Sequence, residues 1–444
     1  MRRTRLCAVG LSVALALTVT ACGSIAPTAA PGTVYFLNSN VGLISTYAQI
    51  AQVYHAQTGV DIQIFTAVEG AYEQTLAAEF ARTREPSIFE IFGPQGYANH
   101  RGYVAEVSDS QLYAHLHDPT LAISNAAGVY GLPLGIEAFG IVYNDSLMKK
   151  YFALTTKAVS LTSAEQITSF SLLKQVVEDM TAHKEALGIT GVFSAIPLGL
   201  EQTPRWQDHF ADTALHDEFR DTADLTRVIP PEIDFTYGAD MGNLFDLATT
   251  NCTHAPETLG DVTRAQGLVE FAMGRSIFLF GDTHTWEEVS AIQGNAVQEH
   301  NMHFLPLYIG GPGESTQGLS VSSPSYFAIN SHVSAEDQQA SLDFLYWLFS
   351  SKEGKMFVVN DLGFVSPYDT IAPDEGIPDP LAIDAVSWIA RNGIKSVPYA
   401  SWSFPDEQFG ADFAKYLLAH AKGAMDWETV TAKVTESWTS GIVQ

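Results

Sequence analysis

Strand-like and helix-like segments alternate along the first part of the chain, and this alternation is what most constrains the fold. Residues 33–37, 61–65 and 87–92 are short and rich in β-branched and aromatic residues, which favours strands. Residues 41–58 and 69–84 carry apolar side chains at helical spacing. Because strands that alternate with helices form βαβ units, the pattern predicts an α/β fold with a mainly parallel sheet.

The length and the charge of the chain narrow the class of protein further. With 444 residues, of which 46% are hydrophobic and 16% charged, the chain is long enough for two domains that each bury a core. The 50 acidic and 23 basic residues give a formal net charge of −27. A surface this negative repels phosphate backbones, so we expect no nucleic-acid partner.

The first residues have the features of a targeting segment. Three arginines precede an apolar run over residues 6–20, which is shorter than the ~20 residues that span a bilayer. The sequence VTAC that ends at Cys22 resembles the lipobox of bacterial lipoproteins, in which the cysteine is acylated. We therefore expect a signal peptide over residues 1–21 and a lipidated tether over residues 22–32; an ordinary signal peptide with a chance cysteine is the alternative. No second apolar run approaches membrane length, so the mature protein would be anchored at the membrane without crossing it.

Cysteine usage leaves no internal disulfide in the expected mature chain. Cys7 lies in the segment that would be removed, Cys22 would carry lipid, and Cys252 remains alone.

Residues 131–144, GLPLGIEAFGIVYN, place one acid in an apolar stretch. The residues after Glu137 are rich in β-branched and aromatic side chains, as in a buried strand. A carboxylate between apolar flanks is costly to bury unless another group pairs with it. Glu137 could therefore be a core residue paired with an arginine, or a residue that faces a ligand.

This stretch resembles the first interdomain crossing of the extracellular sugar-binding proteins of ABC transporters, the maltose-binding-protein-like group (family 1). Pro133, Glu137, Ala138, Tyr143 and Asn144 match its form P-x-x-x-E-A-x-x-x-x-Y-N. Four further segments match in order, so that the resemblance covers nearly all of the mature chain: residues 34–40, 86–96, 271–286 and 341–358.

The resemblance implies a two-lobed periplasmic-binding-protein-like fold of type II, whose lobes are joined by three chain crossings. We expect the N-terminal lobe to comprise residues 33–135 and 322–396, and the C-terminal lobe to comprise residues 136–321 and 397–444. The second crossing would lie within residues 318–330 and the third near residues 397–404.

A sugar site needs polar side chains for hydroxyl groups and aromatic rings for C–H faces. The polar candidates are Asn38, Asn40, Glu137 and Asp282. The aromatic candidates are Tyr72, Phe92, Trp286 and Tyr326. Each has another interpretation, since the asparagines could cap a helix and the rings could be core or rim residues.

Two departures from the family pattern leave the identity of the ligand open. Thr283 stands where relatives usually have a tryptophan, and Pro324 stands where close relatives often have an acid.

The expected function is the capture of a sugar or oligosaccharide and its delivery to the permease subunits of an ABC transporter at the extracellular face of the cell membrane. We expect a monomer without catalytic residues or a cofactor. We also expect no metal site, because the histidine pairs of the chain have no complete ligand set nearby in sequence. A secreted glycosidase, which would use two carboxylates, is one alternative. The same fold with a polyol or another small solute is the other.

Overall fold

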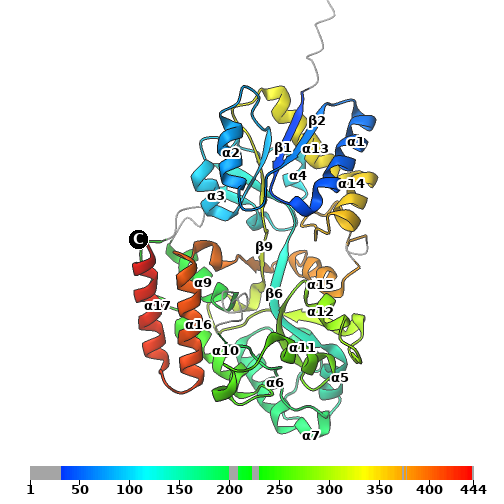
Figure 1. The fold of residues 1–444 in the computed structure, drawn as a ribbon. Helices are drawn as coiled ribbons and strands as arrows, with labels where there is room; N and C mark the ends of the chain where they lie inside the picture. Colours follow the sequence, from blue (N-terminus) through cyan, green and yellow to red (C-terminus); the bar gives the residue numbers. More distant parts are fainter. Residues whose placement is uncertain (1–31, 200–208, 223–229, 373–374, 377, 443–444) are drawn as a thin grey trace, which may run out of the picture.

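The computed structural model describes residues 32–199, 209–222, 230–372, 375–376 and 378–442 (Figure 1). The expected signal peptide, the expected lipidation site Cys22 and all of the expected tether except Gly32 lie outside these residues. Among the described helices, none combines the length and the apolar character needed to span a bilayer.

The first lobe is built on a six-stranded sheet with the strand order β2-β1-β3-β10-β5-β4. The strands are β1 (Val34–Asn38), β2 (Ile62–Thr66), β3 (Ile88–Ile91), β4 (Ile123–Asn125), β5 (Gly128–Pro133) and β10 (Tyr326–Ile329). β1 is parallel to β2 and β3, as predicted, whereas β10 and β4 are antiparallel to their neighbours, so the whole sheet is mixed.

The helices of the first lobe begin and end at local signals in the sequence. They are α1 (Ile44–Thr58), α2 (Tyr72–Phe80), α3 (Gly93–His100), α4 (Gln111–Ala114), α13 (Ala335–Ser350) and α14 (Lys352–Met356), with the short helices η1 (Val41–Leu43), η2 (Pro119–Leu121) and η7 (Phe357–Asp361). Gly59 ends α1 in the left-handed conformation, with φ of 74°. The Ser334 side chain caps α13 by accepting from the Asp337 N–H at 3.1 Å.

The second lobe is built on a five-stranded sheet with the order β11-β9-β6-β7, in which β8 also pairs with β6. The strands are β6 (Glu137–Asn144), β7 (Phe278–Asp282), β8 (Met302–Leu305), β9 (Gln317–Ser322) and β11 (Lys395–Val397). Its helices are α5 (Asp145–Phe152), α6 (Phe170–Ala182), α7 (Lys184–Leu187), α9 (Asp212–Thr222), α10 (Gly238–Thr250), α11 (Arg264–Ala272), α12 (Thr285–Ser290), α15 (Pro380–Ile389), α16 (Glu407–Ala421) and α17 (Trp427–Ile442), with η3 (Ala164–Gln166), η4 (Pro256–Thr258), η5 (Glu299–Asn301), η6 (Glu314–Thr316) and η8 (Ala400–Ser403). Figure 1 shows α16 and α17 as a pair along one side of this lobe.

Two chain crossings run side by side between the lobes. Residues 134–136 lead from β5 to β6, and residues 323–325 lead from β9 back to β10. The Leu134 N–H donates to the Ser325 carbonyl at 3.0 Å and to Ser323 Oγ at 3.2 Å. Both crossings are thus hydrogen-bonded to each other, and β6 and β9 meet the first lobe at the centre of the molecule (Figure 1).

The third passage between the lobes comes earlier than residues 397–404. Tyr368 still belongs to the first lobe, since its hydroxyl donates to the Pro133 carbonyl at 2.7 Å. α15 then contacts β8 and β9, and β11 pairs with β9, so residues 380–396 lie on the second lobe instead of the first. The physical reason is the apolar face of α15, whose buried residues pack on the second sheet.

One hydrophobic core continues from the first lobe through the crossings into the second. Leu134 and Ile136 on the first crossing pack in the same cluster as Ala138 on β6 and Val321 on β9. A second core fills the far side of the second lobe around Ile141. The first crossing is therefore part of the hydrophobic core.

Candidate functional site

Glu137 is the first residue of β6, directly after the crossing. Its side chain keeps 34% of its surface exposed. Strand register places Ser322 of β9 opposite Glu137, and Asp282 of β7 opposite Phe139. Because directly paired residues share a face of a sheet, and alternate residues along a strand do so too, these four side chains lie on one face at the end of the sheet nearest the first lobe.

Asp282 and His284 complete this acidic end of the sheet. Asp282 Oδ1 accepts from the His284 N–H at 2.9 Å and from Thr285 Oγ1 at 3.3 Å, which fixes the turn into α12. His284 Nε2 then lies 3.8 Å from Glu137 Oε1. The carboxylate of Glu137 raises the pKa of His284 against partial desolvation, and the charges of Asp282 and Asp379 act in the same direction. One partner of Glu137 is thus a histidine, His284.

Trp286 lies one turn further, in α12. It is partly buried and packs against the core that continues through the crossings. This position makes it an anchor for α12 that keeps part of its surface exposed.

The polar candidates of the first lobe follow β1. Asn38 is fully buried: its Nδ2 donates to the Phe65 carbonyl at 3.1 Å, and its Oδ1 accepts from Thr66 Oγ1 at 3.1 Å. Asn40 is exposed, and its Oδ1 accepts from the Gly42 N–H at 3.0 Å as the cap of η1. Asn38 therefore supports the loop, while Asn40 is open to a ligand.

The aromatic candidates of the first lobe divide in the same way. The Tyr72 hydroxyl lies 2.9 Å from the Glu90 carbonyl and 2.6 Å from the Glu90 N–H, and the ring is 8% exposed. Tyr326 is 6% exposed in the middle of the sheet. Phe92 is half-buried at the start of α3, with its ring centroid 5.4 Å from that of Tyr72. Of these three rings, Phe92 is the one that is not buried.

An aromatic stack beside Glu137 was not found from the sequence. The His209 ring lies 4.7 Å from Phe139 and 4.2 Å from Tyr399, centroid to centroid. The fully buried Asp212 carboxylate lies 3.3 Å from His209 Nδ1 and accepts from the Ala400 N–H at 2.7 Å, and burial raises its pKa. Phe139 could have been found, since it shares the parity of Glu137 along β6; His209 and Tyr399 come from distant segments and carried no local signal.

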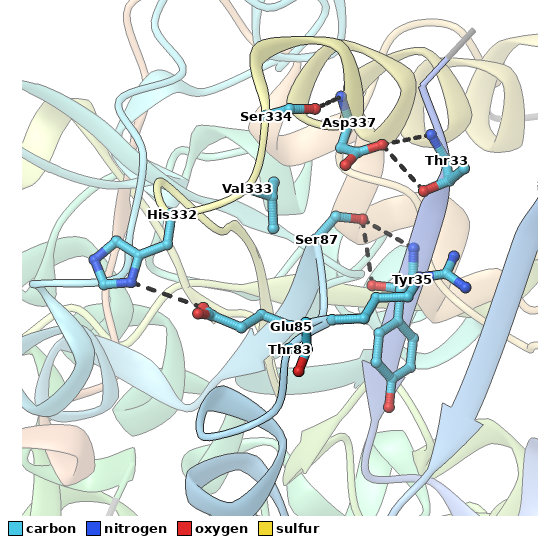
Figure 2. Close-up of a pocket in the computed structure, with 10 residues that line it drawn as sticks. Thr33, Tyr35, Thr83, Glu85, Ser87, His332, Val333, Ser334 and Asp337 are labelled. Carbon is cyan, nitrogen blue, oxygen red and sulfur yellow. Dashed lines mark hydrogen bonds and ion pairs between the residues drawn. The ribbon is translucent and has the colours of Figure 1, made fainter. Parts of the chain in front are cut away.

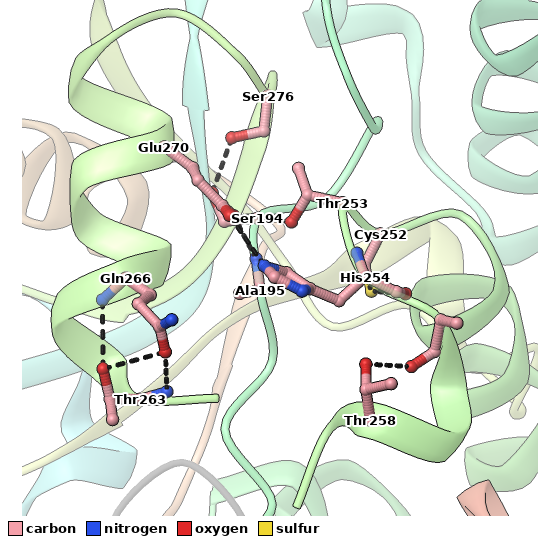
Figure 3. Close-up of polar contacts among 11 residues, drawn as sticks. Ser194, Ala195, Cys252, Thr253, His254, Thr258, Thr263, Gln266, Glu270 and Ser276 are labelled. Atoms are coloured by element: carbon pink, nitrogen blue, oxygen red, sulfur yellow. Dashed lines mark hydrogen bonds and ion pairs between the residues drawn. The ribbon is translucent and has the colours of Figure 1, made fainter. Parts of the chain in front are cut away.

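Cys252 is held in a polar cluster that joins three segments of the second lobe (Figure 3). Its Sγ donates to the His254 carbonyl at 2.9 Å, and burial raises the pKa of the thiol to about 11. Glu270 accepts from the Ala195 N–H at 2.9 Å and from Thr253 Oγ1 at 2.5 Å. A thiol that stays protonated at neutral pH is a poor nucleophile, so this cluster is structural.

A polar cavity of about 250 Å³ lies elsewhere, at the amino ends of β1 and β3 (Figure 2). Thr33 donates to Asp337 Oδ1 at 2.6 Å from its N–H, and His332 lies 3.7 Å from Glu85. The cavity is lined by none of the candidate residues. Ligands of α/β sheets bind outside the carboxyl ends of the strands. Asn40 and Phe92 follow the carboxyl ends of β1 and β3, and Asp282 and Ser322 end β7 and β9, so we place the candidate site on that side and not here.

Comparison with known proteins agrees with the geometry. The family model of the bacterial extracellular solute-binding proteins matches residues 49–385. No curated protein matches the chain.

Solved structures share the fold over nearly the whole chain. A family 1 extracellular solute-binding protein from Alicyclobacillus acidocaldarius is 13% identical, with a TM-score of 0.65 over 94% of this chain and 100% of that one. Its counterpart from Bifidobacterium longum subsp. infantis is 13% identical, with a TM-score of 0.64 over 92% of this chain and 100% of that one. The GacH receptor of Streptomyces glaucescens, solved unliganded and with acarbose, is 16% identical, with a TM-score of 0.54 over 94% and 99%. The expected two-lobed solute-binding fold is thereby confirmed, and because the family model spans most of the chain, the protein belongs to the bacterial extracellular solute-binding proteins.

Proposed function

We propose that the protein captures a sugar or oligosaccharide outside the cell and delivers it to the permease subunits of an ABC transporter. The observation that carries this proposal is the position of Glu137 beside a crossing, on one face with Asp282 and Ser322. Carboxylates are acceptors for the hydroxyl donors of a sugar. Two proteins of similar structure support a sugar: the GacH receptor was solved with acarbose, and another is a chitin oligosaccharide binding protein.

In this proposal each lobe supplies part of the site. Asn40 and Phe92 come from the first lobe, and Glu137, Asp282 and Trp286 come from the second. Asn38, Tyr72 and Tyr326 hold the surrounding backbone from within. A ligand between the lobes gains all contacts only when both lobes approach it, and this differential affinity favours the closed form.

The carboxylates act as acceptors in this mechanism, and no bond of the ligand is broken. A glycosidase would instead place two carboxyl groups about 5–10 Å apart across the scissile bond, one as acid and one as base or nucleophile. Product analysis therefore separates the two functions.

We further propose that Cys22 is acylated and anchors the protein at the extracellular face of the membrane. The basic and apolar run before it supports this proposal. One acyl chain gives only marginal membrane binding, so stable anchoring requires more than one.

The test is a calorimetric screen of mono- to tetrasaccharides that includes acarbose, chitobiose, xylobiose and galactose. The Glu137→Gln variant should bind the best sugar about tenfold to a hundredfold more weakly, because a hydrogen bond to a charged group contributes roughly 1.5–3 kcal/mol. Glu257→Gln is the matched control, since Glu257 is exposed on η4 of the same lobe. Equal affinity of the parent and the Glu137→Gln variant would remove Glu137 from the site, and hydrolysis of the bound sugar would favour the glycosidase.

A further inference from the structure

An acidic side chain lies inside the first lobe, and among the described residues no cation pairs with it. Glu90 is on β3 and is 2% exposed. Its pair across the sheet is Phe327 of β10, an apolar residue. No described lysine, arginine or histidine forms an ion pair with it. An ionised carboxylate in such surroundings is costly, so its hydrogen bonds must serve to hold it.

Both hydrogen bonds of the Glu90 carboxylate come from one residue. Ser39 donates to Glu90 Oε2 from its N–H at 2.9 Å and from its Oγ at 2.5 Å. Ser39 lies between Asn38, which is tied to β2, and Asn40, which is exposed. The carboxylate thus fixes the centre of a segment, residues 38–41, that we name the ligand loop because it carries Asn40.

The other polar groups around Glu90 do not compete with it for protons near neutral pH. Tyr47 of α1 and Tyr72 of α2 face it, and burial keeps the pKa of both phenols well above the usual range, with the charge of Glu90 adding to the effect. Burial raises the pKa of Glu90 itself to about 7, against the bonds from Ser39, which lower it.

We propose that Glu90 is a positioning residue for the ligand loop, and that its ionisation decides how firmly the loop is held. The inference rests on the proposed function for its purpose, since a sugar would meet Asn40 on this loop. When Glu90 is ionised, both bonds from Ser39 are charge-assisted and about twice as strong as neutral ones. When Glu90 is protonated, the same geometry holds the loop less tightly, so the site is less preorganised.

Hydrogen exchange without any ligand tests this proposal separately from sugar binding. The peptide that spans residues 37–43 is followed by mass spectrometry from pH 6 to pH 8 in the parent protein and in Glu90→Gln. The variant keeps an oxygen acceptor for Ser39 but no charge. We expect its protection to match that of the parent at pH 6 and to be roughly three- to tenfold lower than that of the parent at pH 8, the factor expected when charge-assisted bonds become neutral ones.

An internal control removes the intrinsic effect of pH on exchange. The turn at residues 125–128 has an Ala127 N–H that donates to Asn125 Oδ1 at 2.8 Å, and it should show equal protection in both proteins. The Ser39→Ala variant removes one donor and provides a second arm if Glu90→Gln does not fold: it should lower protection of the ligand loop at pH 8 more than at pH 6. Equal protection of the ligand loop in parent and variant at pH 8 would overturn the proposal, whatever the protein is found to bind.

Discussion

Helix α17 docks on α10 through a glycine surface, and replacing Gly242 with alanine tests how closely the two helices pack. Gly238 and Gly242 lie one turn apart on α10. The Trp427 Nε1–H donates to the Gly238 carbonyl at 2.7 Å. A Cβ at Gly242 would lie 2.5 Å from Trp427 Cε2 and 2.8 Å from its Nε1. Carbon atoms normally approach to about 3.5–4.0 Å, so the indole would have to move by about 1 Å.

The magnitude follows from three competing effects. Alanine is the better helix former by about 1 kcal/mol. Overpacking a tight contact costs about 1–3 kcal/mol, and leaving a buried polar group without its partner costs a further 1–3 kcal/mol. The losses exceed the gain, so we expect Gly242→Ala to lower the free energy of unfolding by about 2–3 kcal/mol.

The assay is urea denaturation, followed by circular dichroism and tryptophan fluorescence to check that both transitions coincide. Gly96→Ala is the matched control, because a Cβ there would lie at an ordinary 3.4 Å from Ile91, so this variant should be neutral or slightly stabilised. In a Trp427→Leu background the penalty at Gly242 should largely vanish. A Gly242→Ala protein as stable as the parent, or an unchanged penalty without the indole, would refute the close packing inferred here.

Four further outcomes are expected. Burial outweighs the bonds from Ser39 and raises the pKa of Glu90 from an ordinary 4.5 to about 7, so ionisation costs stability of the fold as a whole even though it strengthens the bonds to Ser39. The free energy of unfolding of the parent relative to Glu90→Gln should therefore fall by about 3 kcal/mol between pH 4.5 and pH 8, and a constant difference would contradict this. The imidazole of His284 should titrate above 6.5 by NMR, and its pKa should fall in Glu137→Gln, whereas equal midpoints would show that the pair is not formed. Cys22→Ala should move the protein from the membrane fraction to the medium, and retention in the membrane fraction would exclude acylation as the anchor. Small-angle scattering should show a smaller radius of gyration on saturation with the best sugar of the screen, and an unchanged radius would argue against closure.

The alternation of strands and helices in the first lobe could be predicted because its strand segments are rich in β-branched and aromatic residues and its helix segments carry apolar residues at helical spacing. The boundary of α2 could not, since Gly70 takes φ of 73° and delays the helix to Tyr72. The place of α15 could not be predicted either: its apolar face could pack on either sheet, and the choice depends on tertiary contacts that no local pattern encodes.

Less of the candidate site could be predicted. The role of Glu137 stays a prediction, which rests on its apolar flanks and on the resemblance at the crossing. Asn38 and Tyr72 have the residue types that a ligand site needs, but the same types also satisfy buried backbone groups, and this is how the fold uses them. His284 and Tyr399 come near Glu137 and Phe139 only through the packing of distant segments.

The insertion of β10 between β3 and β5 has a consequence for biosynthesis. The chain completes β6 to β9 before β10 exists, so a growing polypeptide cannot close its first sheet until most of the second has emerged. During that interval β3 and β5 present open edges. Contacts so distant in sequence form slowly. A chain of this topology therefore stays incompletely folded for much of its synthesis, which is the condition that export in an unfolded state requires, and it depends during that time on whatever keeps those edges from pairing with another molecule.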